Sequence, residues 1–222
     1  MHTGTGRVVE LFLEDGCLYA HISCAKTLIP GSGQFLLASP GSDSLLPVPL
    51  FHTDFTPWGF ISPVPESWNP GDVLSLRGPV GRGFSLPASA RRVGLVAFDS
   101  QPSRLRGLVQ PALRQESSVV LLCDSGSDHL PDEVEFLPMS ALEEILGWAD
   151  YVALDVAREN LTELMDKIKG GNSRPILNGA QVLIRVPMPC GGMAECGVCA
   201  LTTKSDWKMV CRDGPVFDLR EI

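Results

Sequence analysis

The chain has 222 residues, of which 44% are hydrophobic and 20% charged, and its formal net charge is −8. This balance is that of a globular protein with one large or two small domains, and it excludes a disordered chain. The negative charge argues against nucleic acid and against anionic membrane surfaces as partners, because both attract basic faces.

The first half of the chain reads as short strands separated by Pro, Gly, Asn and Asp. Apolar patterning predicts strands over 7–13 and 17–23, joined by the hairpin signal Glu14-Asp15-Gly16. Further strands are predicted over 34–38, 48–53, 58–62 and 72–78. Strands of this length, without a convincing helix among them, indicate a small antiparallel β-barrel, which we place at residues 1–89.

From residue 90 the pattern changes to buried strands that alternate with helices. Continuous apolar runs predict strands over 92–98, 118–123, 151–157 and 181–187. Helical spacing predicts helices over 103–115, 140–149 and 159–169. This alternation is typical of a parallel sheet with helices packed on it, so residues 90–186 are assigned to a Rossmann-like α/β domain of the nucleotide-binding type.

Local signals refine two of these helices. Ser103 is the candidate N-cap of the first helix, and Pro111 is expected to shorten or kink it. Ser140 and Glu143 have the spacing of a capping box at the start of the second.

The chain ends in a segment, residues 187–222, with four of its seven cysteines: Cys190, Cys196, Cys199 and Cys211. The intervals between them hold five, two and eleven residues, close to the four, two and long gap of plant-type ferredoxins. Thiolates are the soft ligands that iron–sulfur clusters require, and the glycines of the segment let the backbone approach a cluster closely. These four cysteines are therefore the candidate ligands of a [2Fe–2S] cluster.

Zinc is the main alternative metal for these cysteines. Structural zinc sites with four cysteines usually present two C-x2-C pairs, and this segment has one, Cys196 and Cys199. The remaining cysteines, Cys17, Cys24 and Cys123, lie in apolar stretches and are expected to be small buried side chains. An odd cysteine count, no signal-peptide pattern and no bilayer-length apolar run predict a cytoplasmic protein without a membrane segment.

The C-terminal residues resemble a known family. The run from Gln181 through the cysteines to Asp213-Gly214-Pro215-Val216-Phe217 is similar to the end of the electron-transfer subunit of the NAD-dependent type of dihydroorotate dehydrogenase. Upstream, residues 30–37 and 71–84 look like barrel strands of ferredoxin-reductase-like proteins. The resemblance implies a flavin barrel, a nucleotide-type α/β domain and a cluster segment with the four cysteines as ligands. It also implies a hetero-oligomer with a flavoprotein catalytic subunit.

The chain departs from that family at both of its nucleotide sites. The flavin segment of the family contains an Arg and a Ser, and the equivalent residues 47–51 contain neither. After the strand at 92–98, where a dinucleotide site has a glycine-rich turn, the chain has Asp99 and no Gly-x-Gly. We therefore expect no NAD(P) binding, and FAD is retained only if unusual contacts replace the degraded motif.

Two functions follow from the sequence. The first is a non-catalytic electron-transfer subunit of pyrimidine biosynthesis, which relays single electrons between its [2Fe–2S] cluster and a flavin on a dihydroorotate-dehydrogenase-like partner. The second is a scaffold subunit without redox function, whose cysteines hold zinc or a structural cluster. The histidines show no metal-site spacing, and Trp207 is expected to pack against its neighbours.

Overall fold

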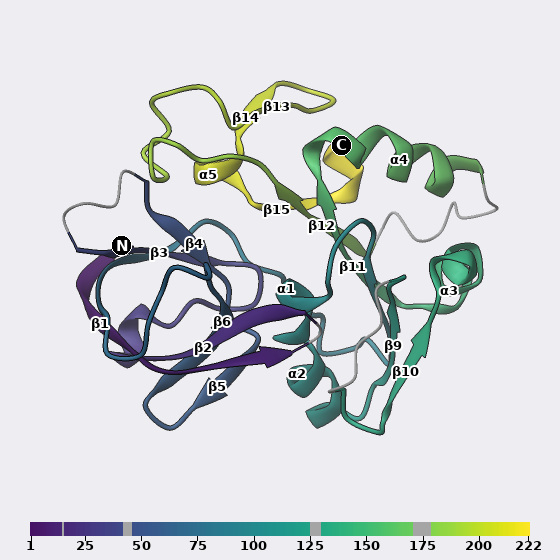
Figure 1. The fold of residues 1–222 in the computed structure, drawn as a ribbon. Coiled ribbons are helices and arrows are strands. Elements are labelled where there is room, and N and C mark those ends of the chain that lie inside the picture. The colour runs from purple at the N-terminus through teal and green to yellow at the C-terminus, as the bar shows by residue number, and fades with distance from the viewer. Residues whose placement is uncertain (15, 42–45, 125–129, 171–178) are drawn as a thin grey trace.

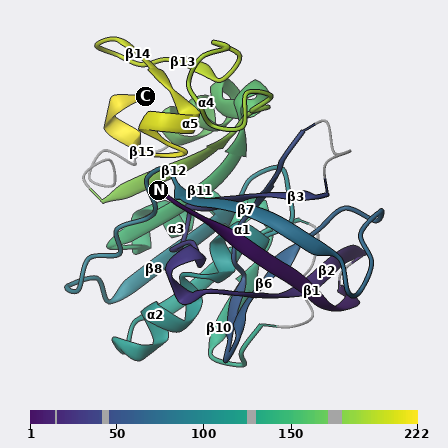
Figure 2. The same cartoon turned by 90° about the vertical axis from the view of Figure 1, so that its left-hand side faces the viewer.

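The computed structural model describes residues 1–14, 16–41, 46–124, 130–170 and 179–222. Two sheets lie side by side, and the C-terminal segment lies above them (Figure 1). A view turned by 90° places the same segment above the N-terminal sheet (Figure 2). No helix in the described ranges is long and apolar enough to cross a membrane.

The N-terminal sheet consists of short antiparallel strands, as predicted. Its order is β4-β3-β7-β1-β2-β6-β5. The strands are β1 (His2–Glu14), β2 (Cys17–Cys24), β3 (Phe35–Pro40), β4 (Val48–Leu50), β5 (Asp54–Thr56), β6 (Gly59–Pro63) and β7 (Val73–Val80). The sheet curls around a core that includes Ile22, Leu36 and Phe60. It remains open at its edge strands β4 and β5, so it is a half-barrel.

The second sheet has the order β10-β9-β8-β11-β12-β15. Its strands are β8 (Arg92–Ala97), β9 (Ser118–Leu122), β10 (Val134–Leu137), β11 (Tyr151–Ala157), β12 (Ala180–Arg185) and β15 (Val216–Asp218). All neighbours pair in parallel except β12 and β15. Every residue of β11 is buried, because helices cover both faces of this sheet. The predicted fold class, an antiparallel barrel-like sheet followed by a parallel α/β unit, is confirmed.

The helices pack on both faces of the second sheet. They are α1 (Ser103–Arg106), α2 (Val109–Arg114), α3 (Leu142–Trp148) and α4 (Leu161–Gly170). Leu105 and Val109 belong to the core on one face, and Ile145 and Leu164 belong to the core on the other. The helices therefore bury the sheet that positions the loops at its carboxyl edge.

Three predictions about helix ends are wrong. The predicted helix over 103–115 breaks after α1, at Gly107, rather than at Pro111, which lies in the first turn of α2 where no backbone donor is needed. Ser103 lies inside α1 and does not cap it. A 3₁₀ turn, Met139–Ala141, precedes α3, so Ser140 lies in that turn and makes no N-cap bond.

The C-terminal segment leaves the second sheet and returns to it. The chain passes from β12 through the cysteine loop to the hairpin of β13 (Ala200–Thr202) and β14 (Trp207–Met209). It then forms α5 (Val210–Asp213) and pairs β15 with β12. The cysteines therefore lie on an excursion whose two ends are fixed by neighbouring strands. β15, which belongs to the third predicted part, completes the sheet of the second. The three-domain division at residues 89 and 186 remains a prediction.

Candidate functional site

The hairpin of the C-terminal segment brings Cys199 and Cys211 together. Cys199 precedes β13 and Cys211 follows β14, and their Sγ atoms lie 3.2 Å apart. The backbone N–H of Val210 donates to the carbonyl oxygen of Cys199 at 3.0 Å, which fixes the spacing of the two elements. Both cysteine side chains are buried. They form the inner pair of the segment.

Cys190 and Cys196 form an outer pair. Cys190 is half-buried and Cys196 is exposed. Desolvation opposes ionisation of Cys190. Hydrogen bonds nevertheless lower its pKa to about 6, and their donors are the backbone N–H of Glu195, the thiol and backbone N–H of Cys196, and the backbone N–H of Met193. The loop thus directs its donors at the Cys190 sulfur and favours the thiolate there.

The two pairs influence each other. Burial, followed by the hydrogen bond and charge of Cys199, raises the pKa of Cys211 to about 12. The charge of Cys190 raises it further, so the outer pair lies within electrostatic reach of the inner one. In the described ranges, no three His, Cys, Asp or Glu side chains gather around one point as ligands of a single metal ion do.

The two candidate metal centres differ in how their ligands are arranged. A structural zinc site needs four ligands around one ion, whereas a [2Fe–2S] core has two irons with two protein ligands each. Two neighbouring pairs of thiols correspond to the second pattern. Gly197, at a φ of +72° with open space at its Cβ position, provides the left-handed turn between Cys196 and Cys199. The chemistry and pairing of the donors fit a two-iron cluster.

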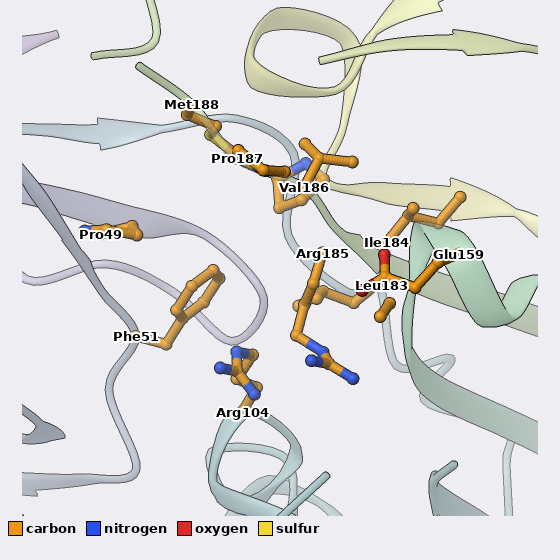
Figure 3. A pocket seen from close by; sticks show the side chains of 12 residues that line it. Pro49, Phe51, Arg104, Glu159, Leu183, Ile184, Arg185, Val186, Pro187 and Met188 are labelled. Carbon is orange, nitrogen blue, oxygen red and sulfur yellow. The ribbon is translucent and has the colours of Figure 1, made fainter. Parts of the chain in front are cut away.

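A cleft opens between the two sheets, below the cysteine segment (Figure 3). It has a volume of about 260 Å³, and its lining includes Pro49, Phe51, Arg104, Arg185 and Met188. The Arg104 guanidinium lies 5.5 Å from the centre of the Phe51 ring, and its Nε atom is buried without a hydrogen-bond partner. The cleft therefore offers an apolar wall and one spare donor.

Charged side chains fill the turn after β8, where a dinucleotide-binding domain holds phosphate. Asp99 accepts hydrogen bonds from the backbone N–H of Ala157 at 2.9 Å and from Nδ2 of Asn160 at 2.7 Å, and it pairs with Arg185. Arg185 Nε also donates to Asp155 at 2.8 Å. The carboxylate of Asp99 therefore occupies the position that the sequence predicted would repel a phosphate.

Asp155 anchors this network from inside the second sheet. Its side chain is fully buried, and Arg104 Nη1 lies 3.3 Å from its Oδ2 atom. Burial raises the pKa of Asp155, and the positive charge of Arg104 acts in the opposite direction. The cations at the mouth of the cleft are thus directed at carboxylates of the chain itself. Arg185 is paired with Asp99 and Asp155, so a diphosphate of FAD or NAD(P) at this position would have to displace a carboxylate.

The exposure of Trp207 and of two of the three remaining cysteines differs from what the sequence predicted. Trp207 is 63% exposed, so the expectation that it packs against its neighbours is wrong. Of the three remaining cysteines, Cys123 is buried, while Cys17 and Cys24 are half-buried. His52, which no motif marked, is a buried histidine. Neither the exposure of Trp207 nor the burial of His52 had a signal in the sequence, because both depend on contacts between distant parts of the chain.

Comparisons with known proteins bear on the C-terminal segment and on the fold. The sequence family described as the iron–sulfur cluster binding domain of dihydroorotate dehydrogenase B matches residues 187–222. The structure of an NADH-dependent reduced ferredoxin-NADP oxidoreductase, solved to study flavin-based electron bifurcation, aligns with a TM-score of 0.75 at 16% identity and covers 97% of this chain and 88% of that chain.

Two further reductases align over most of the chain. The ferredoxin reductase of carbazole 1,9a-dioxygenase gives a TM-score of 0.62 at 16% identity, over 77% of this chain and 66% of that one. Ferredoxin-NADP+ reductase from Plasmodium falciparum gives 0.61 at 10% identity, over 82% and 95%. Identities this low establish the fold alone. The chain therefore has the ferredoxin-reductase-like fold, and its residues 187–222 match the iron–sulfur cluster binding domain of dihydroorotate dehydrogenase B.

Proposed function

We propose that this protein is an electron-transfer subunit whose [2Fe–2S] cluster is bound by Cys190, Cys196, Cys199 and Cys211. The observation that carries the proposal is the arrangement of these cysteines as an inner and an outer pair within electrostatic reach of each other. The match of residues 187–222 to an iron–sulfur binding domain supports it. A bound [2Fe–2S] cluster supplies reversible one-electron transfer.

The side chains and backbone around the cysteines have distinct roles in this proposal. Cys199 and Cys211 bind the cluster on its buried side and exclude water there. Backbone N–H groups of Met193, Glu195 and Cys196 donate to ligand sulfur and stabilise its negative charge. The exposed outer pair leaves one side of the site at the protein surface, so electrons enter or leave on that side.

The proposed partner is a dihydroorotate-dehydrogenase-like flavoprotein catalytic subunit, with which this chain forms a hetero-oligomer in the cytoplasm. The description of the matching family supports this choice. Large apolar side chains are also exposed close to the ligands in sequence: Met193, Val198 and Trp207. Exposed apolar side chains around a redox site are typical of a surface that a partner covers. The chain would then serve pyrimidine biosynthesis as a relay without catalytic residues of its own.

FAD and NAD(P) have weaker support than the cluster. The fold is that of flavin reductases, but the cleft has one spare donor, and the carboxylates of the nucleotide turn are already paired. We expect FAD below stoichiometric amounts and no NAD(P). The alternative function, a scaffold that holds zinc, makes the opposite prediction about the metal.

Metal analysis of anaerobically purified protein tests the proposal. We expect about two irons and two acid-labile sulfides per chain, visible absorption bands that bleach on reduction, and no stoichiometric zinc. Full-length protein that is colourless and contains one zinc per chain would contradict the proposal and support the scaffold function. Flavin released on denaturation is measured in the same sample.

A further inference from the structure

Arg158 reaches the cysteine segment from the second sheet. It lies in the 3₁₀ turn Arg158–Asn160 that follows β11. Its Nη1 atom donates to the carbonyl oxygens of Val198 at 2.8 Å and Ala200 at 3.3 Å. These are the carbonyl groups on either side of Cys199. One guanidinium therefore holds the backbone of a proposed ligand from both sides.

Arg77 reaches the same segment from the half-barrel. It lies on β7, and a Cβ atom added to Gly191 would lie 3.1 Å from its Nη2 atom. The same Cβ would lie 3.1 Å from Cγ of Pro47, and Gly191 has a φ of +59°. A glycine is needed here because the guanidinium approaches the backbone directly beside Cys190.

These two cations lack carboxylate partners among the residues that the structure describes. Both side chains are half-buried. Other arginines with restricted exposure pair with acids, as Arg106 does with Glu14 and Arg185 with Asp155. A partly buried guanidinium without a counter-charge is unfavourable unless a neighbouring group provides negative charge. Arg158 donates to the segment on either side of Cys199, and Arg77 lies beside Gly191, the residue next to Cys190.

We propose that Arg77 and Arg158 are positioning residues that hold the outer and inner cysteine pairs and raise the reduction potential of the cluster between them. The inference rests on the proposed function, since it requires the cluster. Reduction adds one negative charge to a core that is already anionic. Nearby cations therefore stabilise the reduced form more than the oxidised form, and a partly buried site screens this effect less than bulk water does.

Anaerobic redox titration of charge-removing variants tests the inference. In Arg77→Gln and Arg158→Gln, we expect the oxidised-to-reduced ratio at the wild-type midpoint potential to rise about tenfold, which corresponds to a midpoint lower by about 59 mV. Arg77→Lys keeps the charge and should keep most of the potential. The control is Arg114→Gln, the same charge change on an exposed arginine of α2, at the opposite end of the molecule from β13 and β14 (Figures 1 and 2).

Iron and sulfide content, measured on every variant, separates the outcomes. Full clusters with an unchanged midpoint in both glutamine variants would overturn the inference and leave the proposed function intact. An equal shift in Arg114→Gln would also overturn it, because the effect would then be one of net charge alone. Wild-type protein without iron and sulfide would overturn both proposals. If Arg158→Gln loses the cluster and Arg158→Lys keeps it, the positioning role is supported, and Arg77→Gln alone tests the potential.

Discussion

The cysteine segment and the turn after β8 differ in whether their arginines are paired with carboxylates. In the segment, backbone N–H groups point at sulfur, and Arg77 and Arg158 lie beside it without acidic partners among the described residues. In the turn, Asp99 and Asp155 are bound by Arg185 and Arg104. Both regions lie near the carboxyl edge of the same sheet, so their topology alone does not explain the difference.

The difference indicates which of these two regions can bind an anionic group. A cluster or a phosphate binds where nearby donors and cations are not already paired with carboxylates. Among the described residues, Arg77 and Arg158 beside the cysteine segment have no carboxylate partner, so the segment meets this condition. The nucleotide turn does not, because a phosphate there would have to displace carboxylates that are already paired and buried. On the proposed function, a chain with this fold binds a cluster while the carboxylates of its nucleotide turn are paired with arginines.

Loss of one inner cysteine is the largest change that we expect on the cysteine side of this comparison. Cys199→Ser removes a buried thiolate ligand, and serine oxygen is a harder ligand than the iron of a cluster prefers. The visible absorption bands and most of the iron should be lost. Cys123→Ser, a change at a buried cysteine outside the segment, is the matched control and should keep both. Intact bands in Cys199→Ser would remove this residue from the ligand set.

Removal of Asp155 is the corresponding test of the nucleotide turn. Asp155→Ala leaves Arg104 and Arg185 partly buried without their shared carboxylate. Breaking a buried ion pair in this way typically lowers the free energy of unfolding by about 3–5 kcal/mol. Urea denaturation monitored by far-UV circular dichroism measures the loss. Glu163→Ala, which removes one member of the exposed pair with Lys167, should change it by less than about 1 kcal/mol. Equal effects would mean that the network is not what stabilises the turn.

The pKa of His52 reports how far water is excluded from the junction beside the cleft. Burial lowers its pKa to about 4, and the charge of Asp54 opposes this only in part. Because its pKa is lower in the folded protein, His52 binds its proton more readily when unfolded. The protein should therefore keep full stability above the ordinary pKa near 6.5 and lose about 3 kcal/mol as pH falls from there to about 4.

The variant His52→Gln isolates this contribution from other acid-sensitive groups. Its loss of stability between pH 7 and pH 4.5, measured by urea denaturation, should be smaller than that of the wild type, since glutamine does not titrate. Parallel pH profiles of the two proteins would show that the His52 ring is accessible to water. In that case water would reach the His52 ring even though it stacks on Phe55, with 4.4 Å between the ring centres.

The sequence predicted the parts of this structure that depend on local chemistry. Apolar periodicity located the strands of both sheets except β5, β10 and β15, each of which is only three or four residues long. The spacing of the cysteines identified the candidate ligands. The sequence could not predict contacts between residues far apart in the chain. Asp99 was predicted to repel phosphate, but its pairing with Arg185 depends on the packing of β8 beside β11 and β12. Arg77 and Arg158 had no signal for the same reason.

Titration with nucleotides is the smallest expected effect and the sharpest test of the closed turn. We expect NADH and NADPH, up to millimolar concentration, to cause no saturable change in tryptophan fluorescence and no rise in melting temperature. A ligand that binds only the folded state must raise its stability, so an unchanged melting temperature reports weak binding directly. The reason lies in Asp99, whose carboxylate already takes the backbone N–H of Ala157 and the amide of Asn160. Saturable binding with a dissociation constant in the micromolar range would show that the network opens for a dinucleotide, and the contrast between the two regions would then describe only the ligand-free protein.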